Sequence, residues 1–290
     1  MSSHRYLNGD HFAGEDNTQA IIRIDRSSPV VRSDEDGLVS VERFTLQAFL
    51  PLFDASSAGT IIIEDVDGNQ VSQVVDWTPK AVDGYVYNYR HVAEAMSIAI
   101  NTACDDTDIG ADDIPTMTYN DKTSDFSITS TAAFRGSYKI LFDSALYRFF
   151  NSFDFETQQT TYELLLNEDI ETQRTPTLEY LSPVKRIVIQ STMSVQEEYL
   201  PNPTGAQNIV SNFDGSFLVD YSFFAPNGNP MQYIYFSASD ADHRWHNLVR
   251  GANVQNVVMY FKWFDTNNNG HLIKMKKGCS VTCKLYFLVD

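Results

Sequence analysis

The stretch that most constrains the fold of this chain is its C-terminal segment, residues 254–290. Apolar residues fill both faces of a predicted strand at 257–264 (VVMYFKWF), as in strands that are covered on both sides. The TNNNG sequence that follows contains residues that tolerate positive φ, which favours a hairpin turn. A second run, from Leu272 to Phe287, places polar and apolar residues at strand spacing. The segment therefore predicts paired strands and a C-terminus held in a sheet.

Shorter strand-like runs recur along the rest of the chain, separated by Gly, Pro, Asn and Asp. We expect about a dozen strands, with residues 39–53 and a hairpin at 60–77 as the clearest. Apolar residues at helical spacing predict a helix at 91–104, and shorter helices are expected at 145–155 and 242–250. The pattern predicts a mainly β protein: an antiparallel β-sandwich of jelly-roll type with two or three short helices and an extended N-terminal arm.

The distribution of charge suggests three parts. Residues 1–180 contain 12 Lys+Arg and 30 Asp+Glu, whereas residues 181–290 contain 9 and 8. Residues 1–35 lack sustained periodicity, which is typical of an extended arm that is either disordered or ordered against a neighbouring molecule. We therefore expect the arm at 1–35, an acidic β-rich part at 36–180 with its helix near 91–104, and a near-neutral β-sandwich part at 181–290. The sandwich could be one continuous jelly roll or two in tandem.

Composition and charge exclude several classes of protein. Hydrophobic residues make up 43% and aromatic residues 13% of the chain, which excludes a disordered protein. The formal net charge of −17 opposes contact with phosphate backbones, so we expect no direct nucleic-acid binding. No stretch approaches the ~20 apolar residues of a membrane-spanning helix. Residues 1–19 do not resemble a signal peptide.

The three cysteines, Cys104, Cys279 and Cys283, do not make a disulfide framework. Within one strand, Cys279 and Cys283 would lie about 13 Å apart, beyond the ~7 Å between Cα atoms that a disulfide can span. Metal binding would need further ligands close by, and none is visible in the sequence. We expect the cysteines to be small apolar residues in a reducing compartment.

One segment offers a candidate cation site. Asp265, Asn267 and Asn269, followed by Gly270, match the first half of a calcium-binding loop. A complete loop needs a bidentate carboxylate at its twelfth position, where this chain has Lys276. The alternative, a turn between two strands, is favoured.

Other candidate sites lack the spacing of known chemistry. The acidic run at 105–113 and the group Asp242, His243 and His246 offer oxygen and nitrogen ligands in no recognised metal-site pattern. The sequence has no GxSxG, P-loop or GxGxxG motif. Enzyme activity thus has no positive support in the sequence, and we expect a protein that is not an enzyme and uses no cofactor or metal, with a hydrolase on a β scaffold as a third interpretation.

Tyrosines alternate with other residues in two places, at residues 85–89 and at Tyr233 and Tyr235. Tyrosine rings can stack on sugars, so Tyr233 and Tyr235 mark a possible glycan-binding face. The half-exposed face of an ordinary strand explains the same alternation without a ligand, and this interpretation is favoured.

In its order of features the chain resembles the jelly-roll capsid proteins of non-enveloped icosahedral DNA viruses, particularly the minor or penton-type proteins of virophages and Polinton-like viruses. The resemblance lies in the arm before RFTLQAFLPLF, in HVAEAMSIAINTAC with PTMTYNDKTSDFSI, in YKILFDSALYRFFNSF, and in the terminal VVMYFKWFD and KKGCSVTCKLYFLVD. It implies a β-sandwich whose edges and arm contact neighbouring subunits in a shell, with no catalytic residues.

From this resemblance we expect a virion structural protein, a minor vertex- or penton-type component assembled in the interior of the host cell. It would form a homo-oligomeric ring or shell, together with other capsid proteins, through its strand edges and arm. Deleting residues 1–35 should then leave a folded protein that no longer assembles. The alternatives are the major capsid protein of a small virus and a carbohydrate-binding or attachment β-sandwich.

Overall fold

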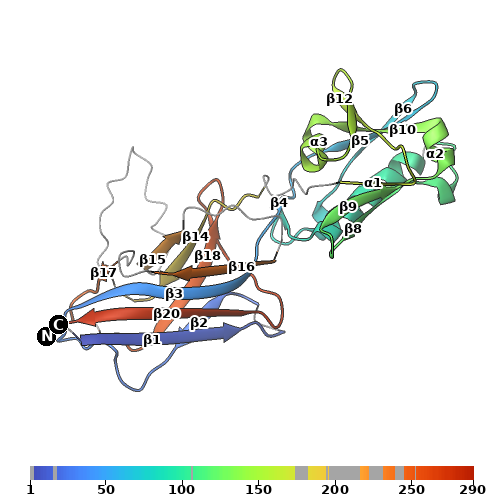
Figure 1. Cartoon of the computed structure of the whole chain (residues 1–290). Coiled ribbons are helices and arrows are strands. Elements are labelled where there is room, and N and C mark those ends of the chain that lie inside the picture. Colours follow the sequence, from blue (N-terminus) through green and yellow to red (C-terminus); the bar gives the residue numbers. More distant parts are fainter. Residues whose placement is uncertain are drawn as a thin grey trace. The chain divides into compact units, whose positions relative to one another are not determined.

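The computed structural model describes residues 3–15, 18–105, 107–173, 182–193, 195, 216–221, 231–238, 245–251 and 253–290. The chain forms two compact units. Unit 1 comprises residues 1–50, 184–225 and 231–290, and unit 2 comprises residues 51–183 and 226–230. In sequence, the bulk of unit 2 is therefore an insertion into unit 1 (Figure 1).

Unit 1 is a sandwich of two antiparallel sheets. Sheet A has the strand order β1-β20-β3-β16, with β17 also paired to β3, and sheet B has the order β15-β14-β18-β19, with β2 also paired to β18. The strands of sheet A are β1 (Ser3–Phe12), β3 (Gly37–Phe49), β16 (Met231–Ser237), β17 (His246–Asn247) and β20 (Ser280–Val289). The strands of sheet B are β2 (Ile21–Ile24), β14 (Arg186–Ser191), β15 (Ser216–Tyr221), β18 (Val257–Phe264) and β19 (Gly270–Leu272).

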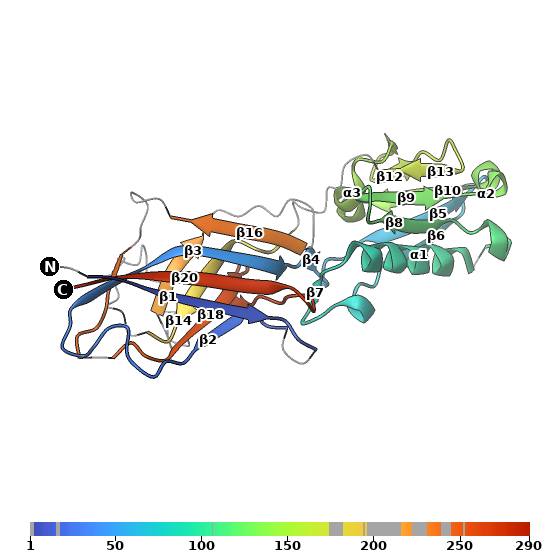
Figure 2. The same ribbon diagram turned by 60° about the horizontal axis from the view of Figure 1, so that its bottom comes forward.

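Eight of these strands are connected as a jelly roll. The chain enters sheet A with β1, sheet B with β2 and sheet A with β3, and after unit 2 it continues through β14 and β15 in sheet B, β16 in sheet A, β18 in sheet B and β20 in sheet A. Two four-stranded sheets built in this way are the double-sheet arrangement of a jelly roll. The described residues of unit 1 thus form one jelly roll rather than two in tandem (Figures 1 and 2).

The core of unit 1 lies between the two sheets and follows from strand alternation. In β20 the odd-numbered residues from Val281 to Val289 are buried, and the even-numbered residues are half-buried. Phe44 of β3 meets Phe261 of β18 edge-to-face across the sandwich, with 5.9 Å between ring centroids. Because successive side chains of a strand point to opposite faces, this pattern gives each sheet one inner and one outer face.

The C-terminal segment contributes to both sheets. The TNNNG sequence joins β18 to β19 as an antiparallel hairpin, as predicted. The second run is divided, however, because the chain leaves β19 at Leu272 and crosses to sheet A, where β20 lies between β1 and β3. Gly278, at φ 83°, lies in the crossing and adopts a conformation that an ordinary strand residue avoids.

The N-terminal segment is built into unit 1, which differs from the free arm expected at 1–35. All ten residues of β1 pair with β20, and β2 pairs with β18. Arg5 adds a bidentate ion pair to Glu35, with N–O distances of 2.7 and 2.8 Å. The unit boundaries fall at 50/51 and 183/184 rather than at 35 and 180. The helix expected at 242–250 also differs, since His246–Asn247 form β17, and residues 239–244 lie outside the described part.

Unit 2 combines short sheets with three helices. Its sheets have the strand orders β11-β12-β10-β5-β6, β13-β9-β8 and β4-β7. The helices are α1 (Tyr89–Asp105), α2 (Ala132–Ser137) and α3 (Ser144–Phe150). The strands are β4 (Phe53–Asp54), β5 (Thr60–Asp65), β6 (Gln70–Val74), β7 (Tyr85–Val86), β8 (Thr116–Asn120), β9 (Asp125–Thr129), β10 (Tyr138–Asp143), β11 (Phe155–Thr157), β12 (Thr161–Leu164) and β13 (Ile170–Thr172).

Helix α1, which contains the range 91–104 expected from the sequence, organises the core of unit 2. It packs against β5, β6 and β8, and so joins two of the sheets (Figure 2). Its buried side carries Val92, Met96, Ile100 and Ala103 at helical spacing. The helix begins where the Asn88 side chain accepts a hydrogen bond from the backbone N–H of Arg90, at 2.9 Å.

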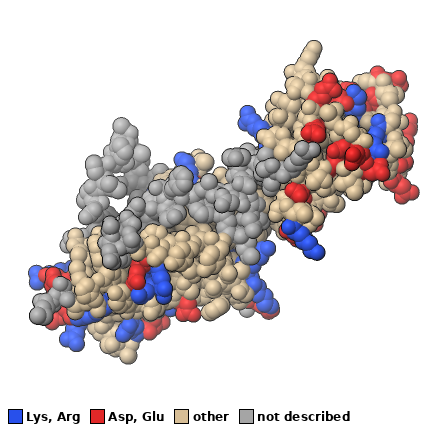
Figure 3. All heavy atoms as spheres, in the orientation of Figure 1, with Lys and Arg blue, Asp and Glu red and all other residues tan. Residues whose placement is uncertain are grey.

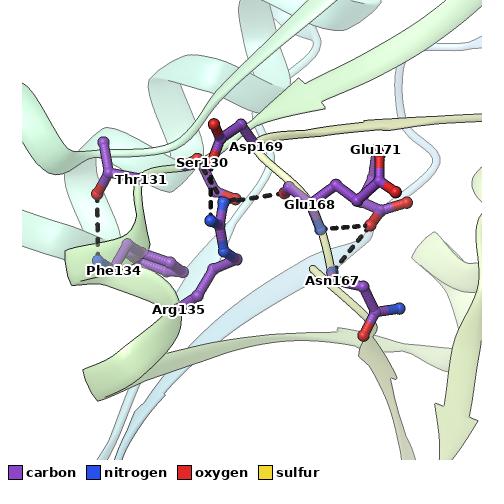
Figure 4. Close-up of polar contacts among 8 residues, drawn as sticks. All are labelled: Ser130, Thr131, Phe134, Arg135, Asn167, Glu168, Asp169 and Glu171. Atoms are coloured by element: carbon purple, nitrogen blue, oxygen red, sulfur yellow. Dashed lines mark hydrogen bonds and ion pairs between the residues drawn. The ribbon is translucent and has the colours of Figure 1, made fainter.

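A polar cluster beside α2 fixes the connection between β12 and β13 (Figure 4). Arg135 donates to the backbone carbonyls of Ser130 and Glu168, at 2.8 and 2.9 Å, and forms an ion pair with Asp169 at 2.7 Å. Glu171 accepts hydrogen bonds from the backbone N–H groups of Asn167 and Glu168. The guanidinium group of Arg135 therefore holds the end of β9 against the connection between β12 and β13.

Candidate assembly surface

In the described part of unit 1, the outer face of sheet A carries most of the exposed aromatic side chains. Among the described residues, the large apolar or aromatic side chains of unit 1 that are exposed are Tyr6 (47%), Phe12 (65%), Tyr233 (65%), Tyr235 (58%) and Val249 (40%). Tyr6 and Phe12 lie on β1, and Tyr233 and Tyr235 lie on β16. Four of the five are therefore on the two edge strands of one sheet.

Strand alternation places these four rings on the same face. Leu7 on β1 and Ile234 on β16 are buried in the sandwich, so their neighbours Tyr6, Tyr233 and Tyr235 point away from it. Pairing through β20 and β3 runs from Asp10 to Thr282, Thr45 and Tyr235 in one row across the sheet. We call this outer face, with its four exposed rings, the edge-aromatic face.

The two inner strands of the edge-aromatic face are polar and already satisfied. The hydroxyl groups of Thr45 and Thr282 form a hydrogen bond of 2.6 Å, and Lys284 forms an ion pair of 2.8 Å with Glu42. The Lys284 ammonium also lies 4.1 Å from the centre of the Tyr6 ring. These groups have partners within the subunit, so the strongest unsatisfied feature of the face is the aromatic surface at its edges.

An aromatic cluster extends the face at one end of β1. The rings of Tyr6 and Tyr286 stack with 5.0 Å between centroids, and His4 stacks on Tyr286 at 5.6 Å. Trp245 meets Tyr286 edge-on at 5.0 Å. Aromatic residues grouped in this way are enriched in protein interfaces.

The two units differ strongly in charge. Unit 2 contains 7 Lys+Arg and 22 Asp+Glu, a formal charge of −15, whereas unit 1 contains 14 and 16, a charge of −2. Figure 3 shows acidic side chains gathered over unit 2 and both signs mixed over unit 1. The field of unit 2 opposes contact between two copies of it, while unit 1 imposes no such barrier.

The cation candidate Asp265, Asn267 and Asn269 forms a tight turn. One carboxylate oxygen of Asp265 accepts the backbone N–H groups of Asn267 and Asn269, both at 2.8 Å, and the other accepts the Asn269 side-chain amide at 2.9 Å. Burial raises the pKa of Asp265, but these bonds and one from His271 outweigh it and lower the pKa overall. The oxygens face N–H donors, which supports a hairpin turn and not a cation site.

The same turn occurs in unit 2, between β5 and β6. The Asp65 carboxylate accepts the backbone N–H groups of Asp67 and Asn69, at 2.9 and 2.8 Å, and the Asn69 side-chain amide at 2.7 Å. The fourth residue has positive φ in both turns, 83° at Gly68 and 66° at Asn268. A partial calcium-loop motif in a β-rich chain can therefore be a hairpin signal.

The remaining metal-ligand candidates from the sequence lie partly outside the described residues. Asp242 and His243 lie outside the described residues, and no group of three or more His, Cys, Asp or Glu in the described part could hold a metal ion. Tyr87 and Tyr89 are buried in unit 2, which leaves Tyr233 and Tyr235 as the exposed pair. No helix among the described residues is long and apolar enough to cross a membrane.

All three cysteines are described, buried and without a disulfide. Burial raises the pKa of Cys104 to about 11 and that of Cys283 to about 12, so both thiols stay protonated at neutral pH. Sequence reasoning missed Tyr6 and Phe12, because β1 buries little apolar surface and its alternation is visible only once Leu7 and Gly9 are known to face inward.

Comparison with known proteins was made by sequence and by structure. No family model and no curated protein matches the sequence. The structure matches the mavirus penton protein with a TM-score of 0.74 and 28% identity, covering 99% of this chain and 100% of that one. It also matches a chain in the cryo-EM structure of the Sputnik virophage, with a TM-score of 0.68, 18% identity and coverage of 99% and 97%.

These matches confirm the resemblance inferred from the sequence, and at 18% identity the second supports the fold alone. Both matched proteins belong to virus particles. The match to a penton protein extends over the jelly roll and its inserted unit, and it favours the minor over the major type of capsid protein. Over its whole length the chain is accordingly similar to a virophage penton protein, and it is a minor structural component of the virion.

Proposed function

We propose that this protein forms a closed homo-oligomeric ring at the vertices of a virion, held together by unit 1. The observation that carries the proposal is the edge-aromatic face, because Tyr6, Phe12, Tyr233 and Tyr235 expose aromatic surface on both edge strands of one sheet. Exposed aromatic surface of this kind is typical of surfaces that are covered in an assembly. Repeated head-to-tail contacts between identical subunits close into a ring when the rotation between neighbours divides a full turn.

The charge difference between the units supports the same arrangement. At −15, two copies of unit 2 repel each other, so contacts between copies are favoured through unit 1, at −2. Unit 2 would then face solvent, and other capsid proteins would contact the ring around unit 1. The same net acidity disfavours direct contact with the genome. We place assembly in the interior of the host cell, before the particle is complete.

The N-terminal segment takes part in this proposal as strand β1 rather than as a loose arm. Deleting residues 1–35 removes β1 from sheet A and β2 from sheet B, so we expect the deletion to unfold unit 1. The deletion therefore cannot separate folding from assembly. Substitutions of Tyr233 and Tyr235 can, because both side chains are exposed on the outer face of sheet A.

The mass of the purified full-length chain, measured by light scattering with electron micrographs of the same fraction, tests the proposal. The double variant Tyr233→Ser, Tyr235→Ser should lower the mass from that of a ring to that of a monomer. Val249→Ser is the matched control, because Val249 is an exposed apolar residue of the same unit outside the edge strands. A wild-type chain that stays monomeric at every concentration contradicts ring formation.

A glycan-binding face at Tyr233 and Tyr235 is the second candidate. The observation in its favour is that both rings are exposed side by side on one strand. Sugars stack on such rings without needing a charged partner. Glycan arrays on wild type and on the double variant distinguish the candidates: tyrosine-dependent glycan signals from a monomeric protein would favour attachment over assembly.

A further inference from the structure

We propose that neighbouring subunits join sheet A edge to edge, with β1 of one copy pairing with β16 of the next. This inference rests on the proposed ring and names the strands that form its contact. Its partner is a second copy of this chain. The resulting interface would continue one antiparallel sheet from subunit to subunit.

The two strands end the same sheet. Among the described residues, β1 pairs only with β20, and β16 pairs only with β3. Each therefore has a row of backbone N–H and C=O groups on the side where the described part of the chain places no strand. The open edge of β1 extends over the ten residues Ser3–Phe12, and that of β16 over the seven residues Met231–Ser237. Seven paired residues would give a contact about 24 Å long.

The directions of the strands are compatible with this pairing. Every neighbouring pair in the order β1-β20-β3-β16 is antiparallel, so β16 runs opposite to β1. Rotation about an axis along the strands leaves strand direction unchanged. A second copy related by such a rotation presents its β1 antiparallel to β16, as in every other pair of sheet A. Because one edge of sheet A is β1 and the other is β16, this pairing is a head-to-tail contact, which is the kind of contact that a ring requires.

Backbone hydrogen bonds identify the amides that face the open edges. Ala13 donates to the carbonyl of Cys279 at 2.9 Å. Bonding alternates along an antiparallel pair, so the even-numbered residues of β1, such as Tyr6 and Asn8, direct their N–H groups to the open edge. Ala238 donates to the carbonyl of Glu42 at 2.7 Å, and by the same alternation the odd-numbered residues of β16 face its open edge.

The side chains agree with the backbone. The edge-facing amides belong to residues whose side chains lie on the edge-aromatic face, which include Tyr6 and Phe12 on β1 and Tyr233 and Tyr235 on β16. Pairing would bring aromatic residues of two copies opposite or diagonal to each other on one face. Aromatic cross-strand pairs stabilise antiparallel sheets. Such a contact would explain why the exposed rings lie on the edge strands and not on the inner strands.

Two variants at one position test the edge contact. Asn8→Pro removes an edge-facing N–H group without touching the bonds between β1 and β20, because a proline is tolerated on the free side of an edge strand. Asn8→Ala removes the side chain and keeps the N–H group. We expect Asn8→Ala to form rings like wild type, and Asn8→Pro to raise the subunit dissociation constant by at least about tenfold, or 1.4 kcal/mol. Light scattering over a dilution series measures both.

Hydrogen exchange on the wild-type ring gives a second measurement that does not depend on the folding of the proline variant. The edge-facing amides, such as those of Tyr6, Asn8 and Tyr235, should exchange at least about tenfold more slowly in the ring than in diluted monomer, because hydrogen bonding protects them. Rings in which these amides exchange as fast as in monomer, or rings of unchanged stability from Asn8→Pro, overturn the edge contact while leaving the ring itself in place. A wild-type chain that never assembles overturns both.

Discussion

Gly9 of β1 lies so close to Ile22 of β2 that a Cβ atom at position 9 would come within 2.5 Å of the Ile22 Cγ2 atom. Strand β1 belongs to sheet A and β2 to sheet B, so this is a point where the two sheets approach each other closely. Only the residue without a side chain fits there.

Gly9→Ala should therefore destabilise unit 1 by about 1–3 kcal/mol, the usual range for overpacking a core. Thermal unfolding, followed by the near-ultraviolet signal of Trp245 and Trp263 in unit 1, measures the effect. Gly14→Ala is the matched control, because a Cβ atom at position 14 meets nothing within 4 Å. Equal stability of the two variants would show that β2 can move away from β1.

The two aspartate turns should stabilise the unit in which each lies. Asp265→Ala removes a buried carboxylate that accepts three hydrogen bonds of 2.8 to 2.9 Å and a longer one from His271, and it should destabilise unit 1 by about 1–3 kcal/mol. Asp65→Ala should lower the unfolding midpoint of unit 2 and leave unit 1 unchanged. Hydrogen exchange resolved by peptide assigns each loss to its unit, and a loss in the wrong unit would contradict the assignment.

The Arg5–Glu35 ion pair should make the attachment of β1 sensitive to acid. The hydrogen bonds from Arg5, with one from the Arg32 backbone, lower the pKa of Glu35 to about 2. Because the pKa of Glu35 is lower in the folded than in the unfolded chain, the ionised carboxylate stabilises the fold. This stabilisation is complete at pH values above the unfolded-state pKa, about 4.3, and is lost as the pH falls toward 2.

Glu35→Gln should reduce the dependence of unit 1 stability on pH within this window, from about 4.3 down to 2. Urea denaturation at pH 2.5, 4 and 7 measures it, with Glu15→Gln as the control because Glu15 is mostly exposed. If the stability of unit 1 depended on pH in the same way in wild type and in Glu35→Gln, the ion pair would not be the source of the acid sensitivity.

Arg135→Lys should loosen unit 2 even though the charge is kept. A lysine cannot present the planar fork that contacts the carbonyls of Ser130 and Glu168 and the carboxylate of Asp169 at once. We expect faster hydrogen exchange at residues 167–172 and a loss of about 1–2 kcal/mol in the stability of unit 2. Arg148→Lys, at an exposed position on α3, is the control. Unchanged exchange at 167–172 would contradict this role.

Local patterns predicted the parts of the fold that local chemistry determines. The alternation in β20, the turn at Asp265 and the helical spacing of α1 were all visible in the sequence because each depends on neighbouring residues. Local patterns could not predict which strands pair with each other, because pairing joins segments that are far apart in the sequence, as β20 does with β1 and β3. The inserted unit was missed because the acidic composition continues across residue 50, where no Gly- or Ser-rich linker marks the boundary.

The candidate surface was harder to predict than the fold. Tyr233 and Tyr235 were noticed as an alternating pair, but the sequence does not show that β16 is an edge strand of sheet A. Tyr6 and Phe12 lie in a segment that has little apolar periodicity and was therefore assigned to an arm. An assembly surface depends on which strands are at the edge of a sheet, and strand order is a property of the complete fold.

The position of β20 in the middle of sheet A has a consequence for synthesis on the ribosome. Residues 51–183 emerge as a continuous block and can form unit 2 early, whereas β1 gains its only described strand partner when β20 emerges. A nascent chain that stops before residue 280 thus has no ordered β1 edge to offer a neighbouring subunit. The topology would exclude chains that lack β20 from assembly without any separate check, because β20 is made after the other described strands of unit 1.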